Sequence, residues 1–387
     1  DGGEPYEDLR LVGLVGLLDP PREDVGDLIA SCHRAGVEVV MVTGDQPRTA
    51  GAVAAQVHIA DEDQARAMKG GELPSADQVR DEQCERILAT RVFARFTPEQ
   101  KLDLIDIYQS AGHVVAMTGD GINDAPALEQ ADIGVAMGRR GSDAARQASD
   151  MVLQDDAFAS IVAAMRQGRV IFGNIRKAVT FMICTNVAEV LAIVAAAVTG
   201  SPLPLLPLQI LYLNMLTDVL PALALGVGEG PRGIMDRPPR RQGESILTRS
   251  HWLFIGGWGV GIAACVLAAL TAGLWWLGLD QRTAVTVSFL TIALAKRWFG
   301  FNLREIGSTW RDNTIVRNRW LWGAIGLCLV LVAAAVYLPG LSGLLKTRPP
   351  GPAGWAVAVG LSLVPLGVGQ AILAVRLRVS RGGGAGR

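Results

Sequence analysis

The sequence predicts a parallel α/β domain followed by an all-α bundle of six transmembrane helices. Three observations support this fold class. Short β-branched runs alternate with helical stretches in the first half of the 387 residues, long apolar stretches fill the second half, and the charge changes sign between the halves. Residues 1–175 carry 29 acidic and 16 basic side chains, whereas residues 176–387 carry 8 and 20. This division excludes a single soluble globule and also a disordered chain.

The first half alternates strands and helices in the manner of a parallel sheet covered by helices on both faces. Strands are expected at residues 11–17, 37–42, 91–96, 113–117 and 133–137. Helices are expected at residues 22–35, 47–57 and 98–110. Ligands of such sheets bind beyond the carboxyl ends of the strands, so the residues that follow each strand are the candidates for function.

Three polar clusters follow the ends of these strands, and each suits phosphoryl chemistry. They are Thr43-Gly44-Asp45, Thr97–Lys101 and Thr118–Pro126. Glycines such as Gly44 let backbone amides approach an anion just before a helix begins. The Thr43 hydroxyl can donate to a phosphoryl oxygen, and Lys101 can offset the charge that develops during transfer.

The third cluster also offers metal ligands. Asp120 and Asp124 lie four residues apart at a strand-to-helix turn, where their hard oxygens can bind Mg²⁺. Each cluster by itself is a weak signal, because Thr-Gly-Asp is a common turn and a lysine early in a helix is usually solvated. Three clusters in order at successive strand ends, and the specific run Thr118–Ala125, favour the functional interpretation.

The second half contains six stretches long enough to cross a bilayer of about 30 Å, which needs roughly 20 helical residues. They are expected at residues 178–199, 205–227, 252–278, 284–303, 320–340 and 355–376. Arginines crowd the second loop, the fourth loop and the C-terminal tail, so the positive-inside rule places the acidic half and the C-terminus in the cytoplasm of a multi-pass cell-membrane protein. The expected parts are a domain over 1–157, a helical stalk over 158–177, a membrane domain over 178–378 and a tail over 379–387.

Polar residues inside the first two spans indicate a cation site. The first span carries Asn186 and Glu189 on one helical face, and the second carries Asn214, Thr217 and Asp218 on one face. An ionisable group in hydrocarbon costs about 3 kcal/mol or more, so it is normally paired or functional. Two such stripes of oxygen atoms can hold a hard cation; the alternative is that they join helices by hydrogen bonds.

Two nearby residues bear on this site. Pro221, three residues past Asp218, is expected to loosen the helix and free backbone carbonyls. Lys296 in the fourth span has two possible arrangements: its ammonium extends to the cytoplasmic interface, or it pairs with Glu189 and replaces an ion.

Several motifs carry a resemblance to a known family. Met117–Leu128 (MTGDGINDAPAL) resembles the hinge motif of the P-type ATPases, which belong to the haloacid-dehalogenase (HAD)-like superfamily. Asp19–Arg22, Phe93–Lys101, Ile133–Gly138 and Asp236–Arg240 are similar to further segments of that family. The resemblance extends over nearly the whole chain, and the most similar subgroup is the type II pumps, which include calcium pumps.

The resemblance implies an HAD-like domain and a mechanism in which an aspartate is phosphorylated by MgATP and cation transport is coupled to its hydrolysis. Mg²⁺ and ATP are the implied cofactors. By motif match, Asp120 ligates Mg²⁺, Asn123 and Asp124 order the phosphorylation site, Thr43 and Lys101 contact the phosphoryl group, and Gly44 and Asp45 lie near the nucleotide.

The resemblance also sharpens the cation site. Asn186–Glu189 and Asn214–Asp218 are similar to the fifth-span and sixth-span ligand patterns of calcium pumps, which favours Ca²⁺ as the transported ion. Mn²⁺, Mg²⁺, Na⁺ and K⁺ remain alternatives. The eighth-span position at which related pumps place a glutamate aligns with Ala293, so one ligand of a two-ion site is in doubt.

The chain departs from the family in one respect. It contains neither the Asp-Lys-Thr-Gly-Thr segment that is phosphorylated nor the Thr-Gly-Glu-Ser loop. It therefore resembles the C-terminal portion of a pump, and it is expected to be inactive without its partners: an actuator domain, a nucleotide-binding domain and four further spans. The alternatives are a catalytically silent module that assembles with a separate polypeptide, and a membrane-anchored phosphatase-like domain. No feature indicates binding to nucleic acid.

Overall fold

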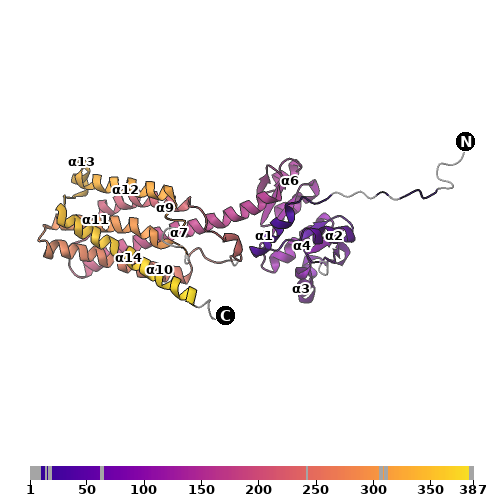
Figure 1. The fold of residues 1–387 in the computed structure, drawn as a ribbon, viewed down its shortest axis with the longest axis horizontal. Helices are drawn as coiled ribbons and strands as arrows, with labels where there is room; N and C mark the ends of the chain where they lie inside the picture. The colour runs from indigo at the N-terminus through magenta and orange to yellow at the C-terminus, as the bar shows by residue number, and fades with distance from the viewer. Residues whose placement is uncertain are drawn as a thin grey trace. The chain divides into compact units, whose positions relative to one another are not determined.

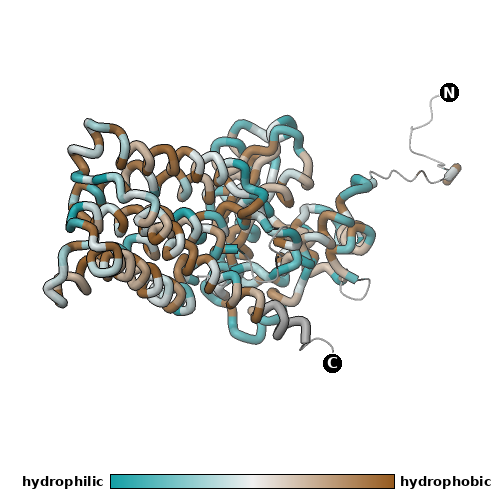
Figure 2. The backbone as a smooth tube through the Cα atoms, turned by 60° about the vertical axis from the view of Figure 1, so that its left-hand side comes forward, coloured by the Kyte–Doolittle hydropathy of each residue, from teal (hydrophilic) through white to brown (hydrophobic). Residues whose placement is uncertain are grey.

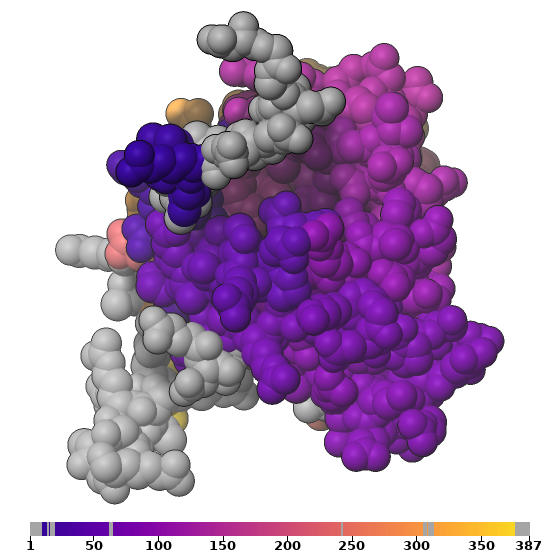
Figure 3. All heavy atoms as spheres, turned by 90° about the vertical axis from the view of Figure 1, so that its right-hand side faces the viewer, coloured from indigo at the N-terminus to yellow at the C-terminus, as the bar shows by residue number. Residues whose placement is uncertain are grey.

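The computed structural model describes residues 10–13, 15, 20–61, 65–240, 243–304, 308 and 313–382, the last seven by backbone alone. The chain divides into two units, shown in Figure 1. We call Asp1–Ala163 with Met235–Gln242 the N-terminal unit, and Ala164–Ile234 with Gly243–Arg387 the bundle unit. Figure 3 shows one face of the N-terminal unit.

The strands of the N-terminal unit form two three-stranded sheets in which every pair is parallel. The first has the order β1-β3-β2, with β1 at Met41–Thr43, β2 at Met68–Lys69 and β3 at Val92–Ala94. The second has the order β4-β5-β6, with β4 at Ala116–Gly119, β5 at Ile133–Met137 and β6 at Met151–Leu153. The prediction of parallel strands is therefore confirmed, but the described strands form two sheets because β1 and β4 do not pair.

Three helices of this unit lie close to their predicted positions: α1 (Val25–Arg34), α2 (Pro47–Gln56) and α4 (Pro98–Ser110). Three more helices, for which no bounds were predicted, are α3 (Asp81–Ala89), α5 (Ala125–Gln130) and α6 (Asp143–Gln147). The 3₁₀ turns are η1 (Gly70–Glu72), η2 (Ala76–Gln78), η3 (Ile122–Asp124) and η5 (Ile234–Asp236), of which η5 begins at the last residue before the unit boundary. The start of α4 follows from its sequence, because Thr97 accepts a hydrogen bond from the amide of Gln100 and Pro98 occupies the first turn.

Strand β3 is buried on both faces, as a central parallel strand must be. Val92 and Ala94 pack in a cluster with Ile29 of α1, whereas Phe93 packs with Leu104 of α4 on the opposite face. This packing holds the carboxyl ends of β1 and β3 together, and Thr43 lies opposite Ala94 in the ladder.

Three strand predictions need correction. The described residues at 11–13 and 15 form no strand, and Leu11 and Val12 are exposed; residues 14, 16 and 17 lie outside the described part. Strands β1 and β4 begin several residues later than predicted, because β-branched residues alone do not show where ladder pairing begins. The two-residue β2 and the three-residue β6 were not predicted from the sequence.

The bundle unit contains the six apolar helices that the sequence predicts. Among the described residues, six helices are long and apolar enough to cross a membrane. They are α7 (Phe158–Val198); α8 (Pro207–Tyr212), η4 (Leu213–Asp218) and α9 (Val219–Gly226) in succession; α10 (Arg249–Thr271) with η6 (Ala272–Trp276); α11 (Gln281–Phe299) with η7 (Gly300–Leu303); α12 (Arg319–Tyr337); and α14 (Gly351–Gly382). A short helix, α13 (Pro339–Leu345), precedes α14. Hydrophobic residues recur along these helices (Figure 2).

Helix α11 is the buried centre of the bundle. The apolar window of the Gln281–Leu303 span is 89% buried, compared with 22% for that of α14. It packs against α10 and α14. Lys296, inside the buried part of α11, is therefore shielded by the surrounding helices.

Candidate functional site

Thr43, the last residue of β1, lies beside the loop after β3. The amide of Phe96 donates to the Thr43 carbonyl at 3.2 Å, and the amide of Asp45 donates to the Thr43 hydroxyl oxygen at 3.1 Å. Gly44 and Asp45 are exposed. The first and second predicted clusters thus meet at one end of the β1-β3-β2 sheet.

Lys101 joins the second cluster to the third. Its ammonium donates to Asp124 Oδ1 at 2.6 Å, and the amide of Gly121 donates to Asp124 Oδ2 at 3.1 Å. Burial by itself would raise the pKa of Asp124, but the hydrogen bonds from Lys101 and Gly121 outweigh it, so the pKa is lowered. Asp124 is therefore an ionised carboxylate with both oxygens engaged.

Glycine is required next to Asp124. A Cβ added at Gly119 would lie 2.6 Å from Asp124 Cβ, which is closer than real contacts allow. The close approach of this backbone to Asp124 fixes where the carboxylate meets Lys101.

Asp120 is the carboxylate that remains available to a metal. Its side chain and that of Asn123 are exposed, whereas the Asp120 carbonyl accepts a hydrogen bond from the amide of Ser142 at 2.8 Å. Among the described residues, no group of three or more histidine, cysteine or acidic side chains is arranged so that it could hold a metal ion. One exposed carboxylate fits Mg²⁺ of the kind bound by one or two carboxylates together with phosphate oxygens and water.

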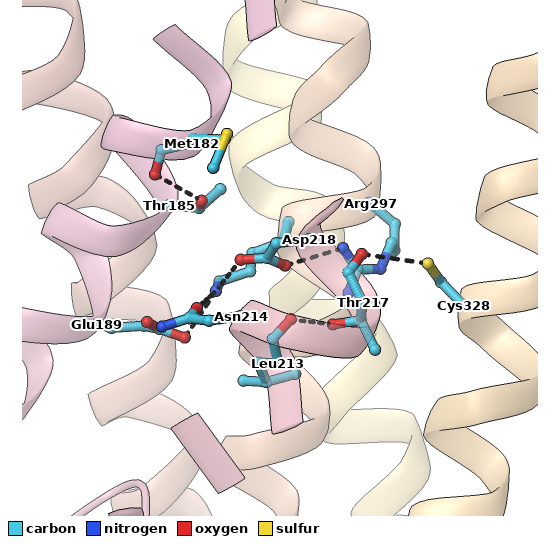
Figure 4. A network of polar contacts seen from close by, with 10 residues as sticks. Met182, Thr185, Glu189, Leu213, Asn214, Thr217, Asp218, Arg297 and Cys328 are labelled. Carbon is cyan, nitrogen blue, oxygen red and sulfur yellow. Dashed lines mark hydrogen bonds and ion pairs between the residues drawn. The ribbon is translucent and has the colours of Figure 1, made fainter. Parts of the chain in front are cut away.

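A second cluster of charges lies inside the bundle unit. Lys296 of α11 donates to Glu189 Oε1 of α7 at 2.6 Å and to Asp218 Oδ2 of η4 at 2.6 Å. The exposed fractions of the three side chains are 0%, 4% and 5%. Glu189, Asn214 and Asp218 converge from two helices in Figure 4. Of the two arrangements expected for Lys296, the structure shows the pairing with Glu189.

Arg297 completes the charge balance of this cluster. Its Nη1 donates to Asp218 Oδ1 at 3.3 Å, while its Nε and Nη2 make no hydrogen bond to the described residues. Lys296 also donates to Asn214 Oδ1 at 3.4 Å. Two buried acidic side chains thus face two buried basic side chains, so their formal charges cancel. The sequence showed Lys296 and Arg297 together but gave no signal that Arg297 is buried.

The helix that carries Asp218 is widened, as Pro221 suggested. Leu213–Asp218 is a π-helix, a form frequent at functional sites. Pro221 has no amide hydrogen, so it cannot bond the carbonyl of Thr217 four residues earlier. That carbonyl instead accepts from the Cys328 thiol of α12 at 3.2 Å, while the Thr217 hydroxyl donates to the Leu213 carbonyl at 2.8 Å (Figure 4). The role of Cys328 could not be foreseen, because it depends on which helix packs beside Thr217.

The structure does not bring every predicted ligand together. Asn186 lies on α7 near Glu189, but its side chain is exposed. It therefore does not belong to the cluster around Lys296.

Two family models match the chain. Residues 202–375 match the C-terminal region of cation-transporting ATPases, and residues 1–132 match haloacid dehalogenase-like hydrolases. The first match covers five of the six apolar helices, including η4 and α11, and the second covers the clusters at Thr43, Lys101 and Asp120.

Several curated proteins are similar over most of the chain. A calcium-transporting ATPase of Bacillus subtilis is 38% identical over 93% of this chain and 40% of its own length. A probable cation-transporting ATPase F of Mycobacterium bovis is 40% identical over 92% of this chain and 40% of its own. A P-type sodium-transporting ATPase4 of Toxoplasma gondii is 42% identical over 70% of this chain and 21% of its own. The chain thus spans about 40% of the length of the first two relatives.

Proposed function

We propose that this chain, which belongs to the family of cation-transporting P-type ATPases and matches the C-terminal part of its members, forms the phosphate-handling and cation-binding portions of an ATP-driven cation pump. One observation carries the proposal. Glu189 and Asp218 approach each other from two apolar helices, and a buried ammonium lies between them at 2.6 Å from each. Carboxylates that already hold one cation in a membrane-spanning bundle have the chemistry to hold another.

The N-terminal unit would serve the phosphoryl chemistry. Asp120 would hold Mg²⁺, which neutralises phosphoryl oxygens when it is bound. Asp124 would position the site rather than ligate the metal, because Lys101 and the amide of Gly121 engage both its oxygens. Thr43 and Lys101 would contact the phosphoryl group, Asn123 would order the same loop, and Gly44 and Asp45 would lie toward the nucleotide.

The cation we propose is Ca²⁺, bound one ion at a time. Asp218, Glu189, Asn214 and Thr217 present hard oxygen atoms, which suit Ca²⁺. A divalent ion that enters a neutral cluster must compete with Lys296, so the ammonium would act as a tethered counter-ion that returns when the ion leaves. Mn²⁺, Mg²⁺, Na⁺ and K⁺ would compete for the same oxygens. The Asn186 side chain is exposed, so in this proposal it would bind a cation only together with pump segments outside this chain.

The topology we propose has the N-terminal unit, the large loops and the C-terminus in the cytoplasm, because the arginines are concentrated in those segments. The parts would be a phosphorylation domain over 1–157, a stalk over 158–177, a membrane domain over 178–378 and a tail over 379–387. The natural partners would be an actuator domain, a nucleotide-binding domain and four further spans.

Calcium titration of purified 1–387 in detergent tests the cation site. We expect saturable Ca²⁺ binding that is lost in Glu189→Gln, and tighter binding in Lys296→Gln because the competing ammonium is gone. Lys346→Gln, which removes an exposed lysine of the bundle unit, is the matched control. Equal calcium heats for the wild type and Glu189→Gln would refute the site.

A second experiment tests whether the chain acts alone. Without an Asp-Lys-Thr-Gly-Thr segment, we expect 1–387 to incorporate no hydroxylamine-labile phosphate from ATP. Addition of the missing pump portions as a separate polypeptide should restore ATPase activity if the two parts assemble. If 1–387 by itself incorporated such phosphate, the phosphorylated aspartate would lie in this chain, and its assignment to another segment of the pump would be wrong.

A further inference from the structure

Two adjacent acidic residues, Asp155 and Asp156, join β6 to the 41-residue helix α7. The side chain of Asp156 is directed to a loop that is distant in sequence. Its Oδ1 accepts from the amides of Gly138 at 2.7 Å and Arg139 at 3.0 Å, and its Oδ2 accepts from the amide of Arg140 at 3.0 Å. One buried carboxylate thus holds three consecutive backbone amides.

The backbone of Asp156 is held in an uncommon conformation. Its φ of 53° lies in the left-handed region, which non-glycine residues seldom adopt, although aspartate tolerates it better than most. Its carbonyl accepts from Arg22 Nη1 at 2.8 Å, and its amide donates to the Leu153 carbonyl. Such strain persists only where surrounding contacts fix it, and it is concentrated at functional sites.

The loop that Asp156 holds is in contact with the backbone of Asp120. The amide of Ser142 donates to the Asp120 carbonyl at 2.8 Å. Arg146 braces the same loop from within, because its guanidinium donates to the carbonyls of Gly138 and Gly141. A Cβ at Gly138 would lie 2.6 Å from the Leu153 carbonyl oxygen, so the loop packs directly on β6.

Asp155 has a different task although it is the next residue. Its Oδ1 accepts from the amide of Ala157 at 3.2 Å, and its Oδ2 accepts from the hydroxyl of Ser160 at 2.8 Å. It therefore caps the first turn of α7, where a negative charge also suits the helix dipole. The pair offers two neighbouring carboxylates with separable roles.

We propose that Asp156 is a positioning residue for the metal site: through residues 138–142 it fixes the backbone of Asp120, and hence the carboxylate that binds the divalent cation. This inference depends on the proposed function, because Asp120 is the metal ligand only there. Groups that orient a ligand without touching the metal commonly change its affinity by about 10- to 100-fold when they are replaced.

The test uses Mn²⁺, a paramagnetic substitute for Mg²⁺, titrated into purified 1–387 and followed by the electron paramagnetic resonance signal of the free ion. We expect Asp156→Asn to weaken binding about tenfold, since its amide cannot accept from all three backbone N–H groups while its backbone still tolerates the left-handed conformation. Asp155→Asn, which removes the same charge one residue away, should bind Mn²⁺ as the wild type does. Asp156→Gly, which is free to adopt the same φ, should behave like Asp156→Asn.

Hydrogen exchange of the amides at 138–142 and 119–121 is the second measurement. Both Asp156 variants should exchange faster there than the wild type and Asp155→Asn. Wild-type affinity together with wild-type exchange in Asp156→Asn would overturn the proposal, as would wild-type affinity in Asp156→Gly. If Asp120→Asn binds Mn²⁺ as well as the wild type, the metal assignment under the proposed function is wrong, and the exchange measurement still decides whether Asp156 holds the backbone of Asp120.

Discussion

The two units each contain a lysine that donates to a carboxylate at 2.6 Å, but the surroundings of the two lysines differ. Lys101 and Asp124 of the N-terminal unit retain exposed fractions of 18% and 14%, whereas Lys296 and Glu189 of the bundle unit retain 0% and 4%. Water can replace a lost partner in the first pair but not in the second. The same type of hydrogen bond can therefore be replaced by one to water in the partly buried pair of the N-terminal unit, whereas in the buried pair of the bundle unit no water is available to replace it.

The largest expected effect comes from removal of the buried ammonium. Lys296→Gln leaves Glu189 with no positive partner, and a broken buried pair of this kind typically lowers the free energy of unfolding by about 3–5 kcal/mol. Thermal unfolding in detergent with a chelator measures the loss, and added Ca²⁺ should restore more stability to Lys296→Gln than to the wild type. Lys346→Gln should unfold like the wild type. Equal unfolding temperatures for Lys296→Gln and Lys346→Gln would contradict the comparison.

A smaller effect is expected at the partly buried pair of Lys101 and Asp124. Lys101→Gln removes a charged hydrogen bond to Asp124 and should lower the free energy of unfolding by about 1–2 kcal/mol at neutral pH. The folded state lowers the pKa of Asp124 below its ordinary 3.8, so this stabilisation is present above about pH 4 and is lost as the pH falls through the lowered value. Between pH 6 and about pH 3, the free energy of unfolding of the N-terminal unit should therefore depend less on pH in Lys101→Gln than in the wild type. An unchanged pH dependence would show that Lys101 does not set the ionisation of Asp124.

The smallest effect is expected where both partners are exposed. Arg86 and Glu72 form an ion pair at 2.8 Å with exposed fractions of 67% and 43%. Arg86→Gln should change the free energy of unfolding by about 0.5 kcal/mol or less, and salt should abolish the difference. Urea unfolding at low and high ionic strength measures it. If Arg86→Gln lowered the free energy of unfolding as much as Lys101→Gln does, burial would not explain the order of these effects.

Much of the candidate site near the sheets was predictable. The polar clusters at Thr43, Lys101 and Asp120 follow strands in the sequence, and parallel strands necessarily bring their carboxyl ends to one edge. Within one sheet, this rule accounts for the proximity of the loops after β1 and β3. The contact between Lys101 and Asp124 joins the ends of β3 and β4, which lie in different sheets, so only the tertiary structure shows it. Asp156 could not be assigned in this way, because its function depends on a loop that approaches it only after β5 and β6 have paired.

The bundle unit likewise contains residues whose importance could be predicted from the sequence and residues whose position could not. Glu189 and Asp218 stood out because an acid in an apolar stretch is costly wherever it is placed. The sequence did not determine where the Lys296 ammonium lies. A lysine near a helix end can extend to the membrane interface or turn inward, and both arrangements are compatible with the sequence.

The sequence by itself determined the alternation of parallel strands and helices in the first half, the six apolar helices and the residue types that can bind phosphate and cations, because these follow from local periodicity and from the cost of burying charge. Only the tertiary structure decided which charges meet. The burial of α11 directs Lys296 and Arg297 onto Glu189 and Asp218, and the packing of α12 supplies the thiol that takes the Thr217 carbonyl. Such contacts depend on distances between segments far apart in the chain, which no local pattern specifies.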